Sequence, residues 1–152
     1  FFCDDDGMPC VRLTKQPIAT ERLEYDFVNQ PDLAQTFVVT CAMLGLPFRF
    51  TGLQSLKIKE TDRISALIHE LDKLGYPLHE ACGSEISWDG QRTEVRPHPA
   101  IDTYEDHRMA MAFAPCCFAV PEIYINHPQV VSKSYPHYWD HLKEAGFEIT
   151  AL

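Results

Sequence analysis

The sequence predicts an α/β fold with mixed α+β sheets, built from repeated units. Segments that alternate apolar and polar residues, as strands do, are separated by segments with the three- and four-residue apolar spacing of helices. A coarse repeat of strand, charged helix start, apolar helix and glycine stop recurs at Asp32, at Lys59/Glu60, at Asp106/Arg108 and at Lys133. Because repeated supersecondary units pack against one another, we expect a stacked arrangement of like units.

The first third of the chain is expected to supply strands and one helix. Residues 11–13 form a short strand candidate, and residues 23–27 alternate in the manner of a half-buried strand. Pro31 and Asp32 then open a helix that Gly45 ends, and residues 47–51 form the next strand. The apolar residues of this helix that we expect to share one face are Leu33, Phe37, Val38, Cys41 and Leu44.

The stretch Lys57–Arg63 and the helix that follows it are the most distinctive part of the sequence. Cations and carboxylates crowd into seven residues, and a clean amphipathic pattern follows over residues 64–74. We expect Thr61 to cap this helix and Gly75 to stop it. The charges therefore lie at a helix N-terminus, where free backbone N–H groups and the helix dipole favour bound anions.

The second half of the chain continues the alternation. Short strands are expected at residues 76–78, 85–88 and 93–95, with a hairpin turn at Asp89–Gly90. A strand at residues 101–104 precedes a helix that is apolar nearly all round after Arg108 and should be buried on most sides. The remaining expected elements are a strand at 122–125, a helix opened by 132–136 and stopped by Gly146, and a closing strand at 147–150.

Length and composition place the chain among globular proteins. Its 152 residues suffice for one domain with a core, and 45% of them are hydrophobic. A net charge of −9 argues against a nucleic-acid surface, although a few cations can still dominate one cleft. We expect no membrane span, and the start without methionine leads us to expect a piece of a longer protein. The six cysteines form no CxxC pair, which predicts a reducing, cytoplasmic setting without a zinc site.

The charged helix starts predict a binding site for anions. If they meet in one cleft, they offer cations, helix dipoles and carboxylates to a multiply anionic substrate that undergoes proton transfer. Arg63 and Arg108 suit a bidentate grip on phosphate or carboxylate, whereas lysines suit point-charge neutralisation. The simpler alternative is a set of surface ion pairs and caps at helix ends.

Three segments resemble, in order and spacing, the C-terminal part of the 5-enolpyruvylshikimate-3-phosphate synthases. They are residues 59–63 (KETDR), 106–111 (DHRMAM) and 131–136 (VSKSYP), and Pro31-Asp32 lies upstream, where that family places a catalytic aspartate. The resemblance covers nearly the whole chain from Val11 onward. One departure is Ser55, four residues before the motif lysine, where the family often has an asparagine that touches the phosphate side of shikimate 3-phosphate.

The resemblance implies a fold and a reaction. The family has two similar domains, each of three βαβαββ units, and residues 1–152 would form a single partial domain with about two of these units. The reaction joins phosphoenolpyruvate to the 5-hydroxyl of shikimate 3-phosphate by addition and elimination, and it releases phosphate. The family serves the shikimate pathway to chorismate and aromatic amino acids, and it uses no metal or organic cofactor.

The resemblance also implies roles for individual residues. Asp32 would bind and deprotonate the hydroxyl, and Glu60 would donate a proton to the methylene and later accept one. Lys59 would contact both substrates, while Arg63, Arg108 and Lys133 would bind phosphoenolpyruvate. Asp106 and His107 are interpreted as mainly structural, orienting Arg108.

Partners and alternatives follow from the same resemblance. The partners are the two small-molecule substrates and the missing N-terminal part of the same enzyme, which as a whole would be a monomer. We expect the isolated fragment to be inactive, because the opposite domain supplies most contacts to shikimate 3-phosphate. Two alternatives stay open: a UDP-N-acetylglucosamine enolpyruvyl transferase, and a non-catalytic α/β module that binds anions.

Overall fold

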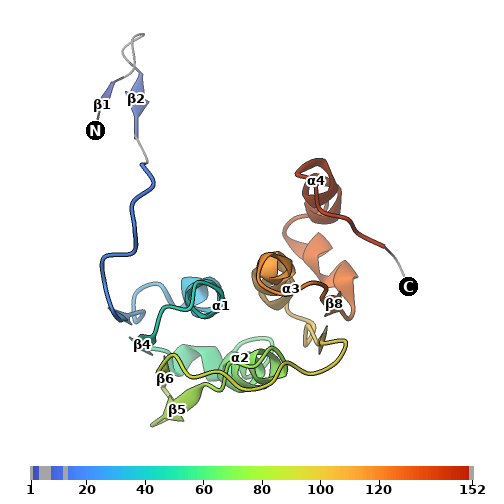
Figure 1. Cartoon of the computed structure of the whole chain (residues 1–152). Helices are drawn as coiled ribbons and strands as arrows, with labels where there is room; N and C mark the ends of the chain where they lie inside the picture. The colour runs from blue at the N-terminus through green and yellow to red at the C-terminus, as the bar shows by residue number, and fades with distance from the viewer. Residues whose placement is uncertain (1, 4–7, 12–13, 151–152) are drawn as a thin grey trace.

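The computed structural model describes residues 2–3, 8–11 and 14–150, which form helices layered on small sheets (Figure 1). The largest sheet has the strand order β3-β4-β6-β5. Its strands are β3 (Leu23–Asp26), β4 (Phe48–Thr51), β5 (His79–Ala81) and β6 (Glu85–Trp88). The α-helices are α1 (Ala34–Met43), α2 (Arg63–Lys73), α3 (His107–Phe113) and α4 (Tyr138–Glu144).

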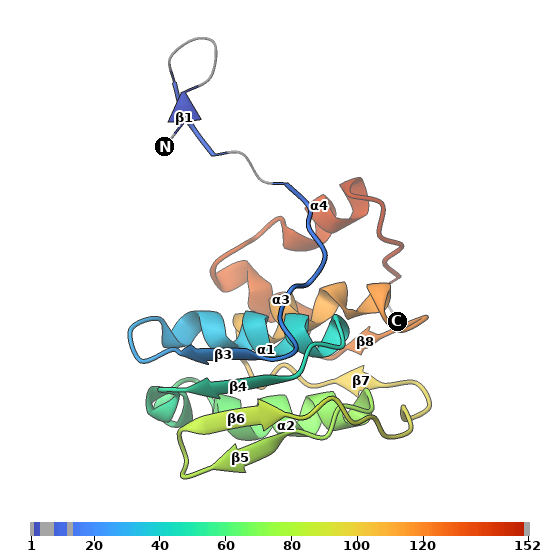
Figure 2. The ribbon, with the colours of Figure 1, turned by 60° about the vertical axis from the view of Figure 1, so that its left-hand side comes forward.

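Shorter elements join these. The 3₁₀ helices are η1 (Pro31–Leu33), η2 (Gln54–Ile58), η3 (Ala114–Phe118) and η4 (Pro128–Lys133). The two-residue strands are β1 (Phe2–Cys3), β2 (Pro9–Cys10), β7 (Ala100–Ile101) and β8 (Tyr124–Ile125). The antiparallel pair β1–β2 lies apart from the rest of the structure in both views (Figures 1 and 2).

Residues 23–88 form one complete βαβαββ unit. Strand β3 runs parallel to β4 with α1 between them in sequence, α2 follows β4, and the antiparallel hairpin β5–β6 closes the unit (Figure 2). The β3–β4 pairing sets Leu23 opposite Phe48 and Asp26 opposite Thr51. The predicted mixed α/β fold is therefore confirmed.

A second unit begins after residue 99. Strands β7 and β8 pair in parallel, α3 lies between them in sequence, and α4 follows, which gives the βαβα start of the same pattern. The chain thus holds one whole unit and the beginning of another, which agrees with the expected repetition of like units, although the repeat expected to start at Lys133 is wrong because Lys133 ends η4.

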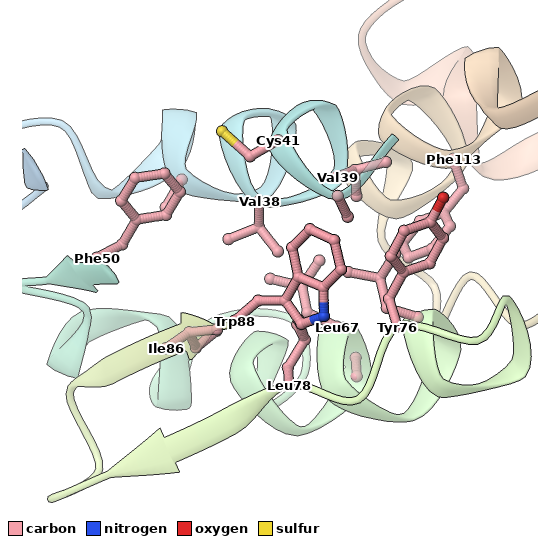
Figure 3. Close-up of a cluster of buried hydrophobic side chains, with 14 of the residues drawn as sticks. Val38, Val39, Cys41, Phe50, Leu67, Tyr76, Leu78, Ile86, Trp88 and Phe113 are labelled. Carbon is pink, nitrogen blue, oxygen red and sulfur yellow. The ribbon is translucent and has the colours of Figure 1, made fainter. Parts of the chain in front are cut away.

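The core lies where α1 and α2 cover one face of the large sheet and α3 packs against α1 (Figure 3). Strands β4 and β6 alternate in burial: Phe48, Phe50, Ile86 and Trp88 point inward, whereas Arg49 lies on the other face. The Trp88 ring lies below Val38 and Val39 of α1 and makes an edge contact with Tyr76 at a centroid distance of 5.4 Å. A smaller cluster packs α3 against η4 and α4.

Helix α1 buries a different face from the predicted one. Val38 and Cys41 are buried as expected, but Leu33, Phe37 and Leu44 are exposed. The buried positions also include small residues such as Ala34 and Ala42, because α1 packs closely against α3 as well as the sheet. The amphipathic pattern of α2, by contrast, was predicted correctly, and Ile64, Leu67 and Leu71 are fully buried.

Several predicted strands are wrong. Tyr76 and Leu78 are buried in the core, but Pro77 lacks an N–H donor, and the strand starts at His79. The hairpin turn falls at residues 82–84, not at Asp89–Gly90. Residues 93–95 instead run along the C-terminal end of α2, where Thr93 N donates to Gly75 O at 3.0 Å.

The C-terminal elements also differ from the prediction. Only Ile101 of the predicted strand 101–104 pairs, within β7. Residues 132 and 133 end η4, and α4 starts at Tyr138, after Pro136. Residues 147–150 are not a strand. Of the strand proposed at 11–13, residues 12 and 13 lie outside the described residues.

Candidate active site

Three charged segments meet because each follows a strand at one edge of the structure. Asp32 lies on η1 after β3, Lys59 to Arg63 follow β4 and η2, and Asp106 to Arg108 follow β7. The carboxyl ends of parallel strands share one sheet edge, which is where α/β folds place their ligands. Gly52, at φ +74°, makes the exit from β4 possible, because a Cβ there would clash with the Asp26 carboxylate and the Val28 backbone.

Arg63 is the centre of the site. Its side chain is only 1% exposed, and three of its atoms bind three carboxylates from different segments. Nε donates to Asp106 Oδ2 at 2.6 Å, Nη1 to Asp32 Oδ1 at 3.0 Å, and Nη2 to Glu60 Oε2 at 2.6 Å. A planar guanidinium has the donor geometry for such multiple pairing. Arg63 therefore ties the starts of α1, α2 and α3 together.

Asp32 is the carboxylate on which the other cations converge. Arg108 Nη2 donates to Asp32 Oδ2 at 3.2 Å, and its Nη1 donates to the Asp32 carbonyl at 3.3 Å. The Lys59 ammonium lies 3.4 Å from Asp32 Oδ1. The Asp32 side chain is nevertheless 43% exposed and that of Glu60 46%, so both carboxylates face solvent at the rim of the cluster.

The cluster lowers the pKa of both rim carboxylates. Burial alone would raise the pKa of Asp32, but Arg108, Lys59 and Arg63 together outweigh it and hold that pKa below its ordinary value. For Glu60, a hydrogen bond from its own backbone amide is the main cause of the lowered pKa, assisted by Arg63, His107 and Lys59. Both groups are therefore anionic at neutral pH.

Aspartates cap the two helices that carry the site. Asp62, rather than the predicted Thr61, caps α2, since its Oδ1 accepts from Ser65 N at 3.1 Å. Asp106 caps α3 by accepting from Arg108 N at 2.8 Å with Oδ1, while its other oxygen binds Arg63. The structural role expected for Asp106 is thus confirmed, and it includes the anchoring of Arg63.

Lys133 reaches the site from a different kind of position than predicted. It lies in the last turn of η4 and not at a helix start. Its Nζ donates to the Glu105 carbonyl at 3.0 Å and lies 4.0 Å from the Glu105 carboxylate. Lys133 therefore holds the turn before Asp106, and its side chain is half exposed.

The structure brings most of the predicted site residues into direct contact. Asp32, Lys59, Glu60, Arg63 and Arg108 form one ion-pair network, and Lys133 touches the neighbouring turn. Sequence reasoning missed the buried carboxylate of Glu70, which binds the same turn from the far end of α2. Its only sequence signal is the ordinary three-residue spacing to Lys73.

In the part of the chain that the structure describes, no three His, Cys, Asp or Glu side chains are arranged to hold a metal ion. Of the helices described, none is both long and apolar enough to cross a membrane.

The fold and the site together define a class of protein. It is an α/β protein with the βαβαββ pattern and a cluster of basic and carboxylate side chains at its strand ends. The family profile for EPSP synthase (3-phosphoshikimate 1-carboxyvinyltransferase) matches residues 10–142. The chain belongs to this family.

Known relatives give the same result. The 3-phosphoshikimate 1-carboxyvinyltransferase of Bacteroides fragilis is 66% identical over 139 residues, which are 91% of this chain and 34% of that protein. The enzyme of the same name from Cellvibrio japonicus is 40% identical over 121 residues, which are 76% of this chain and 26% of that protein. The chain therefore spans between about a quarter and a third of the length of these curated relatives.

Proposed function

We propose that the chain is part of an enzyme that transfers the enolpyruvyl group of phosphoenolpyruvate to the 5-hydroxyl of shikimate 3-phosphate. The observation that carries this proposal is the ion-pair network in which Arg63 joins the starts of three helices. The names of the relatives support the same reaction. Residues 1–152 would be a single partial domain of that enzyme, and the rest of the protein would complete the site.

The reaction needs three proton transfers, two in the addition step and one in the elimination step. In the addition step, the hydroxyl oxygen attacks C2 of phosphoenolpyruvate, loses its proton, and the C3 methylene gains one. In the elimination step, C3 returns a proton and phosphate leaves, so that the enol ether forms. Asp32 would accept the hydroxyl proton, and Glu60 would serve the methylene carbon.

The ion pairs of Asp32 support a way in which substrate would activate these carboxylates. Lys59 and Arg108 now pair with Asp32, which makes Asp32 a weak base. Phosphate and carboxylate groups of the substrates would draw these cations away and add negative charge nearby. Both changes raise the pKa of Asp32 and Glu60, so that Asp32 becomes more basic and Glu60 can hold the proton that it donates.

The buried position of Arg63 bears on its role. We expected Arg63 to bind phosphoenolpyruvate, and that stays a prediction. Its guanidinium already binds three carboxylates, so we propose that positioning of Asp32 and Glu60 is its first contribution. Direct contact with substrate would follow if an anion displaced one of these carboxylates. Lys133 would contact phosphoenolpyruvate after releasing the Glu105 carbonyl.

A chimera tests the proposal. This chain replaces the matched third of the Bacteroides fragilis relative, and phosphate release is measured with both substrates. We expect turnover close to that of the unmodified relative. A folded chimera without turnover would contradict the proposal. The isolated chain should release no phosphate, because it spans only a third of its relatives.

Variants of the chimera test the site. Lys59→Ala, Arg108→Ala and Glu60→Gln should each lower kcat/KM at least about 100-fold with little change in melting temperature, because all three side chains lie at the rim. Arg49→Ala is the matched control, since it breaks the ion pair with Glu85, outside the site, and should keep normal kinetics.

Competition separates the open alternatives. Shikimate 3-phosphate should be consumed by the chimera and UDP-N-acetylglucosamine should not. A preference for the nucleotide sugar would identify the sister reaction, and binding of both anions without turnover would identify a non-catalytic module.

The setting of the enzyme is part of the same proposal. We propose that the whole protein is a cytoplasmic monomer. The free thiols of Cys41, Cys82, Cys116 and Cys117 support a reducing compartment.

A further inference from the structure

A second buried charge lies at the far end of α2. Glu70 is 0% exposed and accepts hydrogen bonds from several donors. Its Oε1 accepts from the Tyr104 hydroxyl at 2.6 Å, and its Oε2 accepts from Asp102 N at 3.2 Å. The Lys73 ammonium lies 2.6 Å from the same Oε2. A buried carboxylate with this set of partners is a fixed anchor rather than a free acid.

What Glu70 anchors is a strained turn. Asp106 N donates to Thr103 O at 2.8 Å, which closes a four-residue turn. Its two central residues, Tyr104 and Glu105, have φ values of +53° and +57°. Such left-handed conformations are unfavourable for residues with a Cβ, and they persist only where the surrounding structure imposes them. Glu70 holds the first central residue through its side chain.

The turn and the residues directly after it make three contacts with predicted site residues. Its last residue, Asp106, binds Arg63 at 2.6 Å. Two residues on, Arg108 binds Asp32 at 3.2 Å. The Glu105 carbonyl accepts from Lys133 at 3.0 Å. A turn that relaxed to ordinary φ values would move all three contacts together.

We infer that Glu70 is a positioning residue for the active site: through the Tyr104 hydroxyl it holds the turn that places Asp106 and Arg108 against Arg63 and Asp32. The expected effect of Glu70 on catalysis rests on the proposed function. The positioning itself is a property of this chain. Lys73 completes the anchor by bridging Glu70, the Ala100 carbonyl at 2.8 Å and the Asp102 carboxylate at 3.3 Å.

The first test uses the chimera. Tyr104→Phe removes one hydroxyl and keeps the ring, so it should fold. We expect kcat/KM to fall about 10- to 100-fold, because small displacements of catalytic groups have effects of this size. Glu70→Gln, which replaces one acceptor oxygen with a donor, should have a similar or larger effect. Glu85→Gln, in an ion pair outside the site, is the matched control and should keep its kinetics.

The second test needs no activity. In the 152-residue chain, the titration of the Asp32 carboxyl is followed by NMR. The charge of Arg108 is one of the main causes that lower the pKa of Asp32, so displacement of the turn in Tyr104→Phe should raise that pKa towards its ordinary value of 3.8. A variant that loses only global stability would leave the Asp32 titration where it is.

The outcomes separate the two proposals. An inactive parent chimera contradicts the proposed function, while the Asp32 titration still decides the role of Glu70. An active parent with unchanged kinetics and unchanged Asp32 titration in Tyr104→Phe overturns the positioning role. A raised Asp32 pKa together with lowered kcat/KM supports it.

Discussion

The two ends of α2 carry charge clusters of opposite construction. At the N-terminal end, a buried cation, Arg63, is surrounded by carboxylates from three segments. At the C-terminal end, a buried anion, Glu70, is surrounded by donors, among them Lys73 and the Tyr104 hydroxyl. Both clusters bind the segment that leads into α3, so one helix holds that segment from two sides.

The exposure of the outer members distinguishes their uses. Around Arg63, the carboxylates of Asp32 and Glu60 are nearly half exposed, and they can exchange their partners for a ligand. Around Glu70, the carboxylate itself is 0% exposed and Lys73 is 11% exposed, so this cluster is closed at its centre, although the Asp102 carboxylate at its edge is 47% exposed. A charge cluster with an open rim suits binding and proton transfer, whereas a closed one suits positioning.

The largest expected effect on stability follows from the removal of Arg63, the buried cation of the N-terminal cluster. Arg63→Ala removes the partner of the fully buried Asp106 and should lower the free energy of unfolding by about 3–5 kcal/mol. Urea denaturation of the chain measures it. Arg49→Ala, in an exposed ion pair with Glu85, should cost less than about 1 kcal/mol. Equal losses in the two variants would show that the N-terminal cluster is ordinary surface charge.

Removal of the cation from the closed cluster should have the next largest effect. Lys73→Met keeps the length of the side chain but leaves Glu70 with the Tyr104 hydroxyl and the Asp102 amide. Loss of a charged hydrogen bond of this kind should lower the free energy of unfolding by about 2 kcal/mol. The same denaturation experiment checks it, and a value as large as that of Arg63→Ala would remove the distinction between the clusters.

The open cluster was predictable and the closed one was not. Asp32, Glu60, Arg63 and Arg108 lie at helix starts, and capping and dipole effects make such positions visible in a sequence. Glu70 lies within α2, and its partner Tyr104 is remote in sequence and in a left-handed conformation. No periodic pattern marks such a contact.

The absence of a sequence signal for tertiary contacts also explains why the buried face of one helix and the position of one strand were predicted wrongly. The amphipathic pattern of α2 predicted its buried face, because α2 packs on the core along one side. Helix α1 contacts both the sheet and α3, so its burial follows small residues such as Ala34 and Ala42 rather than large apolar ones. Residues 93–95 have strand-like composition, yet their backbone forms a hydrogen bond next to the C-terminal end of α2, where Thr93 N donates to Gly75 O.

Removal of the N-cap of α2 should have a smaller effect on stability, and it tests which residue caps the N-terminal end of this helix. Asp62→Ala removes the acceptor of Ser65 N and should lower the free energy of unfolding by about 1 kcal/mol. Thr61→Ala is the matched control, because the Thr61 side chain does not provide the cap, and it should leave stability nearly unchanged. A larger loss in Thr61→Ala than in Asp62→Ala would restore Thr61 as the cap.

The smallest expected effect is a loss of stability at acidic pH. The pKa values of Asp32 and Glu60 are lowered from ordinary values of 3.8 and 4.5, so both carboxylates contribute stability that is present above these values and is lost as the pH falls through the folded-state values. Because both side chains are nearly half exposed, solvent screening should keep the contribution of each below about 1 kcal/mol. Urea denaturation between about pH 6 and pH 3 measures it.

Asp32→Asn should flatten this pH dependence, whereas Glu21→Gln, which alters an exposed carboxylate outside both clusters, should leave it as in the unaltered chain. An unchanged slope in Asp32→Asn would mean that the rim carboxylates gain nothing from their cations, and the open cluster would then lose its electrostatic basis.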